Sequence, residues 1–361
     1  MSDLFTSSEF LSLLDELQQS TCDDSVDAWP RQQLQAMANA GVTAWDVPVE
    51  WGGLDFGPAD QVAGLRLLAS RCLVSTFVWT QRSAAVRRIA TSANTAAKQH
   101  LLPRLLSGEI FATVGISHLT TSGQHLKTPL VAAQKDGDGY LLSGIVPWAT
   151  SATQADYLIT GGALTNGDGD ASGQEVLVCL PSDRTGIDVQ PPLALMGLNA
   201  SQTGAIKLNN VRVDAVDILH GPTEGVMRSG TGGGAGSVGT SALAIGAACG
   251  SLRQFAKEVE RRPELAEFVD PLMAECNRLT ADLNAAALGT ATVNAAEQLR
   301  QNANSLVLRA AQAWLAATKG AGYVAGHPAE RAVRESMFFL VWSCPGPVLA
   351  GNLRELSCAL Q

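Results

Sequence analysis

The spacing of apolar residues divides the chain into three stretches. Over the first hundred residues apolar side chains recur three and four positions apart, as at Leu11, Leu14 and Leu17, which is the spacing of one helix face. Beyond Gly108 the pattern changes to alternation, which is typical of strands. Helical spacing then returns in the Ala- and Leu-rich stretches 240–261, 264–296 and 297–319.

Short strands are expected in the middle of the chain. Asp-Gly pairs at 136–137 and 138–139 offer the positive-φ residues that a tight hairpin needs. The strand-like runs are 111–117, 130–134, 140–144, 156–159, 176–180, 204–208 and 211–213. We predict an α+β fold with an N-terminal helical domain at 1–108, a central antiparallel β-domain, barrel or sandwich, at 109–228, and a C-terminal helical domain at 229–361.

Glycines mark two features of the C-terminal region. The segment SGTGGGAGSVG at 229–239 is too rich in glycine for a membrane helix, so it predicts a flexible linker. Gly246 and Gly250 are four residues apart, on one face of the helix that follows. We expect a neighbouring helix to approach closely at this face.

Composition narrows the class of protein. Only 16% of the 361 residues are charged, against a typical quarter, so we expect surface to be buried in a homo- or hetero-oligomer. The formal net charge of −9 has the wrong sign for a nucleic-acid-binding protein. No segment has the pattern of a membrane span or an export signal.

Cysteine and histidine usage points to a cytoplasmic protein without a metal site. An odd number of cysteines with no C-x-x-C pair predicts reduced thiols. The histidines show no ligand spacing. The cysteines are residues 22, 72, 179, 249, 276, 344 and 358, and the histidines are residues 100, 118, 125, 220 and 327.

Four motifs carry a family resemblance. They are PVEWGG at 48–53, LPRLLSGE at 102–109, DGDGYLLSGIVPWATSATQADYLI at 136–159 and GLNASQTGAIKLNNVRV at 197–213. In this order the chain resembles the acyl-CoA dehydrogenase family over nearly its whole length. The resemblance implies FAD as cofactor, an acyl-CoA or other acyl thioester as substrate, and an electron-transfer partner.

The resemblance also implies cofactor-binding residues. Trp148 would pack beside the flavin ring, and Thr150 would donate a hydrogen bond near the flavin N5. Ser117 would bond the pyrimidine edge, and Ser122 is the best match for the serine that meets pyrophosphate or thioester. An aromatic side chain excludes water beside a redox ring, and hydroxyl donors tune the electronic properties of the ring. The alternative interpretation of Trp148 is an ordinary tryptophan of the core.

A further motif, KGAGYVAGHPAERAVRES at 319–336, resembles the family element that approaches the FAD adenylate, often from a neighbouring subunit. Gly320 and Gly322 occupy the matching positions. A pair of glycines that ends a helix is the alternative interpretation. We expect Arg331 and Arg334 to form a structural or solvated helix face.

The catalytic residues are the main departure from the family, whose base is a glutamate. Alignment from Glu330 places Ser343 at the base position without a gap, or Pro345 with a two-residue gap. The second position known in the family falls in 237–250, which contains no carboxylate. The arginine motif that pairs with the FAD pyrophosphate is also missing from 257–272.

Three residues could substitute for the base, and we expect a structural role for each. His118 follows Ser117 and titrates at a useful pH, His327 precedes a proline in a turn, and Cys344 lies beside the vacant position. The catalytic residues therefore stay unknown at this stage.

Three functions fit the sequence. The first is an FAD-dependent oxidoreductase that acts on an acyl thioester with a noncanonical or missing base. The second is a catalytically silent subunit of a hetero-oligomeric acyl-CoA dehydrogenase. The third is a flavin-dependent monooxygenase on the same fold.

Overall fold

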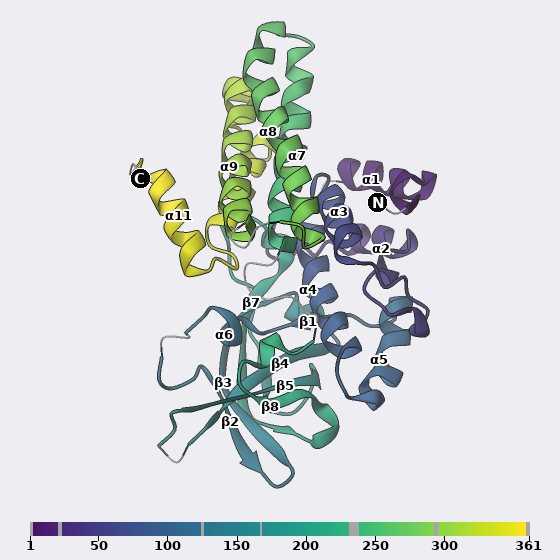
Figure 1. Cartoon of the computed structure of the whole chain (residues 1–361), viewed down its shortest axis with the longest axis vertical. Helices are drawn as coiled ribbons and strands as arrows, with labels where there is room; N and C mark the ends of the chain where they lie inside the picture. The colour runs from purple at the N-terminus through teal and green to yellow at the C-terminus, as the bar shows by residue number, and fades with distance from the viewer. Residues whose placement is uncertain are drawn as a thin grey trace.

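A computed structural model describes residues 3–20, 24–123, 126–166, 168–230, 238–291 and 295–358. A sheet lies below a long helical bundle, and the N-terminal helices lie beside both (Figure 1). Most of the predicted glycine-rich linker, residues 231–237, lies outside the described residues.

The N-terminal region is helical, as the apolar spacing predicts. Helix α4 is buried on nearly every side because it passes between the bundle and the sheet (Figure 1). Gly108 follows the last of these helices with φ +75°, a left-handed conformation that glycine adopts without strain. The helices are α1 Ser8–Gln19, α2 Arg31–Asn39, α3 Pro58–Ala69, α4 Leu73–Ala90 and α5 Thr95–Ser107.

The central region forms one sheet with the order β6-β7-β3-β2-β4-β5-β8, and β1 pairs with β4 beside this path. The strands are β1 Ala112–Val114, β2 Val131–Asp136, β3 Gly139–Thr150, β4 Tyr157–Thr165, β5 Ala171–Pro181, β6 Ile187–Val189, β7 Thr203–Val213 and β8 Ile218–Thr223, with the short helix α6 Ser117–Thr120 after β1. The predicted hairpin is present, since Asp136 pairs with Gly139 across the turn.

The predicted antiparallel β-domain is antiparallel in most of its strand pairs but not in all of them. β1 and β2 both run parallel to β4, so the sheet is mixed. The chain between β1 and β4 contains the whole β2–β3 hairpin, which is the kind of long connection that parallel strands need. Among the described strands, β6 and β8 end the order without pairing to each other, so the sheet is not a closed barrel.

The C-terminal region returns to helices, and its glycines contact α3. A Cβ atom on Gly246 would lie 2.5 Å from the Arg66 carbonyl oxygen, and one on Gly250 would lie 2.7 Å from that of Ser70. The predicted close approach is confirmed. None of the described helices is long and apolar enough to cross a membrane. The helices are α7 Val238–Val259, α8 Ala266–Ala287, α9 Ala295–Gly322, α10 Pro328–Ser336 and α11 Gly346–Leu356.

The prediction that every cysteine is a free thiol is wrong. Cys249 in α7 and Cys276 in α8 form a disulfide, with Cα atoms 6.5 Å apart. The two residues are 27 positions apart in the chain, and only the packing of the two helices brings them together. This disulfide links neighbouring helices of the bundle.

Candidate functional site

A cavity of about 720 Å³ lies where α4, the sheet and the chain after α10 meet. Its lining combines one face of α4 with the ends of β1 and β3, the loop 195–203 and the first residues of α7. The lining residues are Leu65, Phe77, Thr80, Gln81, Ala84, Arg87, Val114, Ile116, Ser117, Thr120, Thr121, Ser122, Trp148, Thr150, Leu195, Met196, Gly197, Leu198, Ser201, Thr203, Gly239, Thr240, Arg334, Met337, Phe338, Leu340, Val341, Trp342 and Ser343.

The structure brings together four of the six residues predicted to bind the cofactor. Ser117, Ser122, Trp148 and Thr150 all line this cavity. Gly320 and Gly322 are not among its described lining residues; they lie at the end of α9. Their place beside the adenylate of a neighbouring subunit stays a prediction.

Trp148 is not a core residue, because 49% of its surface is exposed. Its ring therefore offers an apolar surface to the cavity. The Ser117 hydroxyl donates a hydrogen bond to the Trp148 carbonyl oxygen at 3.2 Å. This contact joins the start of α6 to β3, so Ser117 and Trp148 are held together on the cavity wall.

Thr150 ends a chain of hydroxyl groups. Its Oγ1 lies 3.0 Å from Oγ1 of Thr203, which lies 2.8 Å from Oγ of Ser201. If Ser201 donates to Thr203 and Thr203 donates to Thr150, the Thr150 proton is left for a ligand. All three residues are buried, so little water competes for these groups.

Aromatic side chains form another part of the wall. Phe338 stacks on Trp342 with ring centroids 4.9 Å apart, and Phe77 of α4 meets Phe338 edge to face at 4.7 Å. Such packed rings present a rigid apolar surface. This wall suits the hydrocarbon part of a ligand.

The described residues that line the cavity include no Asp, Glu, His or Cys. Ser343 is among them and Pro345 is not, so the ungapped alignment is the one that reaches the cavity. Ser343 has a left-handed backbone with φ +46°. A serine hydroxyl stays neutral at ordinary pH and is then a very weak base, so the described lining residues offer no ordinary general base.

The three substitutes for the base lie elsewhere. His118 is buried and bonds the Gly161 carbonyl oxygen at 2.9 Å through Nε2. Burial lowers the pKa of His118 to about 4. His327 caps α10 through its Nδ1, and burial raises the pKa of the Cys344 thiol despite the opposing charge of Arg300. The expectation of structural roles agrees with these contacts.

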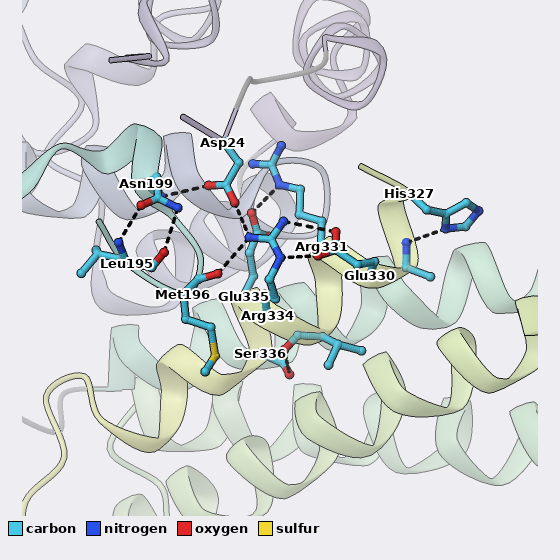
Figure 2. Close-up of polar contacts among 12 residues, drawn as sticks. Asp24, Leu195, Met196, Asn199, His327, Glu330, Arg331, Arg334, Glu335 and Ser336 are labelled. Atoms are coloured by element: carbon cyan, nitrogen blue, oxygen red, sulfur yellow. Dashed lines mark hydrogen bonds and ion pairs between the residues drawn. The ribbon is translucent and has the colours of Figure 1, made fainter. Parts of the chain in front are cut away.

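Figure 2 shows the contacts of Arg334 with the loop whose residues 195–198 line the cavity. Arg334 of α10 pairs with Asp24 and with Glu330, and it donates a hydrogen bond to the Met196 carbonyl oxygen at 2.9 Å. Asp24 in turn accepts a hydrogen bond at 2.9 Å from the backbone N–H of Asn199. The loop 195–199 is therefore tied to both helical regions, and Arg334 has a structural role.

Sequence reasoning missed the contribution of α4, including Arg87. Residues all round this helix are buried, so no amphipathic pattern separates the cavity face from the others. Arg87 lies 3.5 Å from Asp46, a residue far from it in the chain. Among the described residues, no three His, Cys, Asp or Glu side chains are grouped to hold a metal.

Comparison with known proteins adds to this geometry. Residues 13–109 match the acyl-CoA dehydrogenase N-terminal domain family. The probable acyl-CoA dehydrogenase YngJ of Bacillus subtilis (strain 168) is 23% identical over 70% of this chain and 66% of its own. The glutaryl-CoA dehydrogenase of Desulfococcus multivorans is 31% identical over 47% of this chain and 46% of its own. The matched part thus spans about half to two thirds of the length of these relatives.

The solved structure of butyryl-CoA dehydrogenase from Megasphaera elsdenii superposes with a TM-score of 0.82 over 99% of both chains, at 17% sequence identity. The predicted fold class is confirmed. The chain therefore has the acyl-CoA dehydrogenase fold, and its residues 13–109 match the N-terminal domain of that family.

Acyl-CoA dehydrogenases are FAD-dependent, and the residues around the cavity have side chains of the kind that an isoalloxazine would need. The open face of Trp148 offers a stacking surface, and the Thr150 hydroxyl would donate to a ring nitrogen when Thr203 donates to Thr150. Ser117, Trp148 and Thr150 are the residues that would hold the ring.

Proposed function

We propose that this chain is an FAD-dependent oxidoreductase that binds an acyl thioester in the cavity. One observation carries the proposal: the residues that resemble the family's flavin contacts, Ser117, Trp148 and Thr150, share a cavity with the aromatic group of Phe77 and Phe338. One part of the wall would hold the flavin and the other the acyl chain.

FAD, when bound, supplies a two-electron hydride acceptor. The protein would orient the reactants. Thr150 would donate a hydrogen bond toward the flavin N5, and Trp148 would exclude water from the ring. Burial of the acyl chain against Phe77, Phe338 and Trp342 would stabilise the complex by about 0.8 kcal/mol for each methylene group.

The proton chemistry departs from that of the family. No described lining residue is a carboxylate, an imidazole or a thiol. With FAD bound, the flavin would supply the acceptor for a hydride from the substrate β-carbon. The α-proton would pass to water, because no described lining residue is placed to take it, and a carbon–carbon double bond would remain. The substrate thus loses two electrons and two hydrogens, and the reaction would be slow because no base is positioned.

A second candidate is flavin-dependent oxygenation. The same carboxylate-free lining favours it, because reduced flavin and dioxygen can act without a glutamate. It requires a reductase to supply electrons. It predicts flavin that binds firmly but is not bleached by an acyl thioester.

The visible spectrum of the purified protein tests these functions. We expect FAD to bind, and the flavin absorption to bleach slowly when an acyl-CoA is added without oxygen. If an acyl-CoA leaves the bound FAD unbleached, and oxygen reoxidises the chemically reduced flavin faster when a substrate is present, the monooxygenase is favoured. A protein that binds no added FAD would contradict both and favour the silent subunit.

A further inference from the structure

The face of α4 that lines the cavity has two chemically different ends. Phe77, Gln81, Ala84 and Arg87 follow one another three or four residues apart along this face. Ten residues of helix separate Phe77 from Arg87, which corresponds to about 15 Å. The cavity therefore has an aromatic end and a cationic end.

Two arginines line the cavity, and their hydrogen-bonding states differ. Arg334 is saturated by Asp24, Glu330 and the Met196 carbonyl oxygen (Figure 2). The Arg87 Nε is buried without a hydrogen-bond partner among the described residues. The Arg87 side chain is 28% exposed, so a ligand in the cavity can reach it.

Asp46 holds Arg87 in place without using up its donors. The Asp46 side chain is fully buried, and Oδ1 lies 3.5 Å from Nη1 of Arg87. Neither Asp46 oxygen has a hydrogen-bond partner among the described residues, so the pair is a loose ion pair. A guanidinium has five N–H donors, and the contact of Arg87 with Asp46 is made by Nη1.

The lining around Arg87 offers this charge no other counter-ion, since its described residues include no Asp or Glu. A purely apolar ligand would remove water from the guanidinium at a cost in free energy. A ligand carboxylate would instead form a charge-assisted, bidentate pair with it.

We propose that Arg87 is a specificity-determining residue that binds a carboxylate on the acyl group of the substrate. The preferred substrates are thus thioesters of dicarboxylic acids. This inference rests on the proposed function, because it takes the cavity as the acyl-thioester site.

Calorimetric titration with matched thioesters tests the proposal on the protein as purified. Glutaryl-CoA and pentanoyl-CoA have equally long acyl chains and differ in the terminal carboxylate; succinyl-CoA and butyryl-CoA form a shorter pair. We expect the wild type to bind the carboxylated member of at least one pair about 10-fold or more tighter, as a hydrogen bond to a charged group allows. Arg87→Met should abolish that preference by weakening the binding of the carboxylated thioester, while pentanoyl-CoA or butyryl-CoA binds as tightly as before or more tightly, because no guanidinium has to lose water.

Two further variants separate charge from packing. Arg87→Lys keeps a charge without the planar fork, so part of the preference should remain. Arg104→Met removes an arginine of α5 that pairs with Glu109 outside the cavity, and the full preference should survive. A wild type without preference in either pair, or a preference that survives in Arg87→Met, overturns the role of Arg87. If none of the four thioesters binds, the proposed function falls with it.

Discussion

Oγ1 of Thr150 lies 3.0 Å from Oγ1 of Thr203, its register partner on the neighbouring strand β7. Thr203 continues the contact to Ser201. In a chain of hydroxyls in which each group donates to the next, the last hydroxyl accepts a hydrogen bond and keeps its own proton for another partner. When that last hydroxyl belongs to Thr150, the cavity gains a hydrogen-bond donor that is fixed by two strands.

Replacement of Thr150 by Val removes this donor and nearly preserves side-chain volume. We expect FAD affinity to fall about 3- to 10-fold, the value of one ordinary hydrogen bond, and the flavin potential to shift. Fluorescence titration with FAD and a redox titration measure the two effects. Thr185→Val, at an exposed turn, should change neither; equal values in wild type and Thr150→Val would remove Thr150 from the flavin site.

Ser343→Glu places a carboxylate on the cavity lining. We expect anaerobic flavin reduction by an acyl-CoA to accelerate about 100-fold or more, because a positioned general base contributes 10²–10⁴-fold. The φ of +46° at Ser343 costs Ser and Glu alike, because the strain comes from the Cβ atom that both residues have. Stopped-flow absorbance follows the reaction.

The matched control for this gain is Ser357→Glu, at the exposed end of α11. It should leave the rate unchanged. If Ser343→Glu binds FAD normally and reduces it no faster than the wild type, Ser343 does not occupy the position of a base.

Gly246→Ala tests the contact between α7 and α3. The added Cβ would lie 2.5 Å from the Arg66 carbonyl oxygen, and overpacking costs about 1–3 kcal/mol. This exceeds the 0.5–1 kcal/mol that Ala gains over Gly in a helix, so the urea midpoint should fall. Gly346→Ala, where a Cβ would meet nothing within 4 Å, should not lower it. A higher midpoint for Gly246→Ala would show that the helices are further apart.

His118 makes stability depend on pH. Burial lowers its pKa from 6.5 to about 4, so between these values the unfolded chain binds a proton that the folded chain does not. The free energy of unfolding therefore keeps its full value above pH 6.5, where His118 is neutral in both states. It falls as the pH is lowered from 6.5 toward 4. Between pH 7 and pH 5 we expect a loss of up to about 2 kcal/mol.

His118→Gln keeps an N–H donor for the Gly161 carbonyl oxygen and removes the titrating group. Urea unfolding at pH 7 and pH 5 should show a smaller loss of stability in this variant. A loss equal to that of the wild type would mean that His118 is not buried in its neutral form.

The sequence could predict the features that short segments determine. The Asp136–Gly139 hairpin follows from its turn residues, and Gly137 takes the left-handed φ of +59°. Trp148 and Thr150 are two residues apart in β3, and residues two apart share one face of a strand. Both side chains therefore line the cavity.

Features that depend on contacts between distant segments could not be predicted. The parallel pairing of β1 with β4, the Cys249–Cys276 disulfide and the Arg87–Asp46 pair each join residues far apart in the chain. The edge strands β6 and β8 were also missed. β6 has only three residues, and β8 contains the helix- and strand-breaking pair Gly221-Pro222.

Whether this chain is an FAD-dependent oxidoreductase of acyl thioesters is tested most directly by an anaerobic titration with an acyl-CoA. The purified protein is first treated with FAD, and the visible spectrum is recorded after each addition. We expect the wild type to retain flavin whose absorption bleaches slowly. In Thr150→Val the flavin should bleach less completely or be retained more weakly. A protein that retains no FAD, or a bound flavin that no acyl-CoA reduces, would contradict the proposed function.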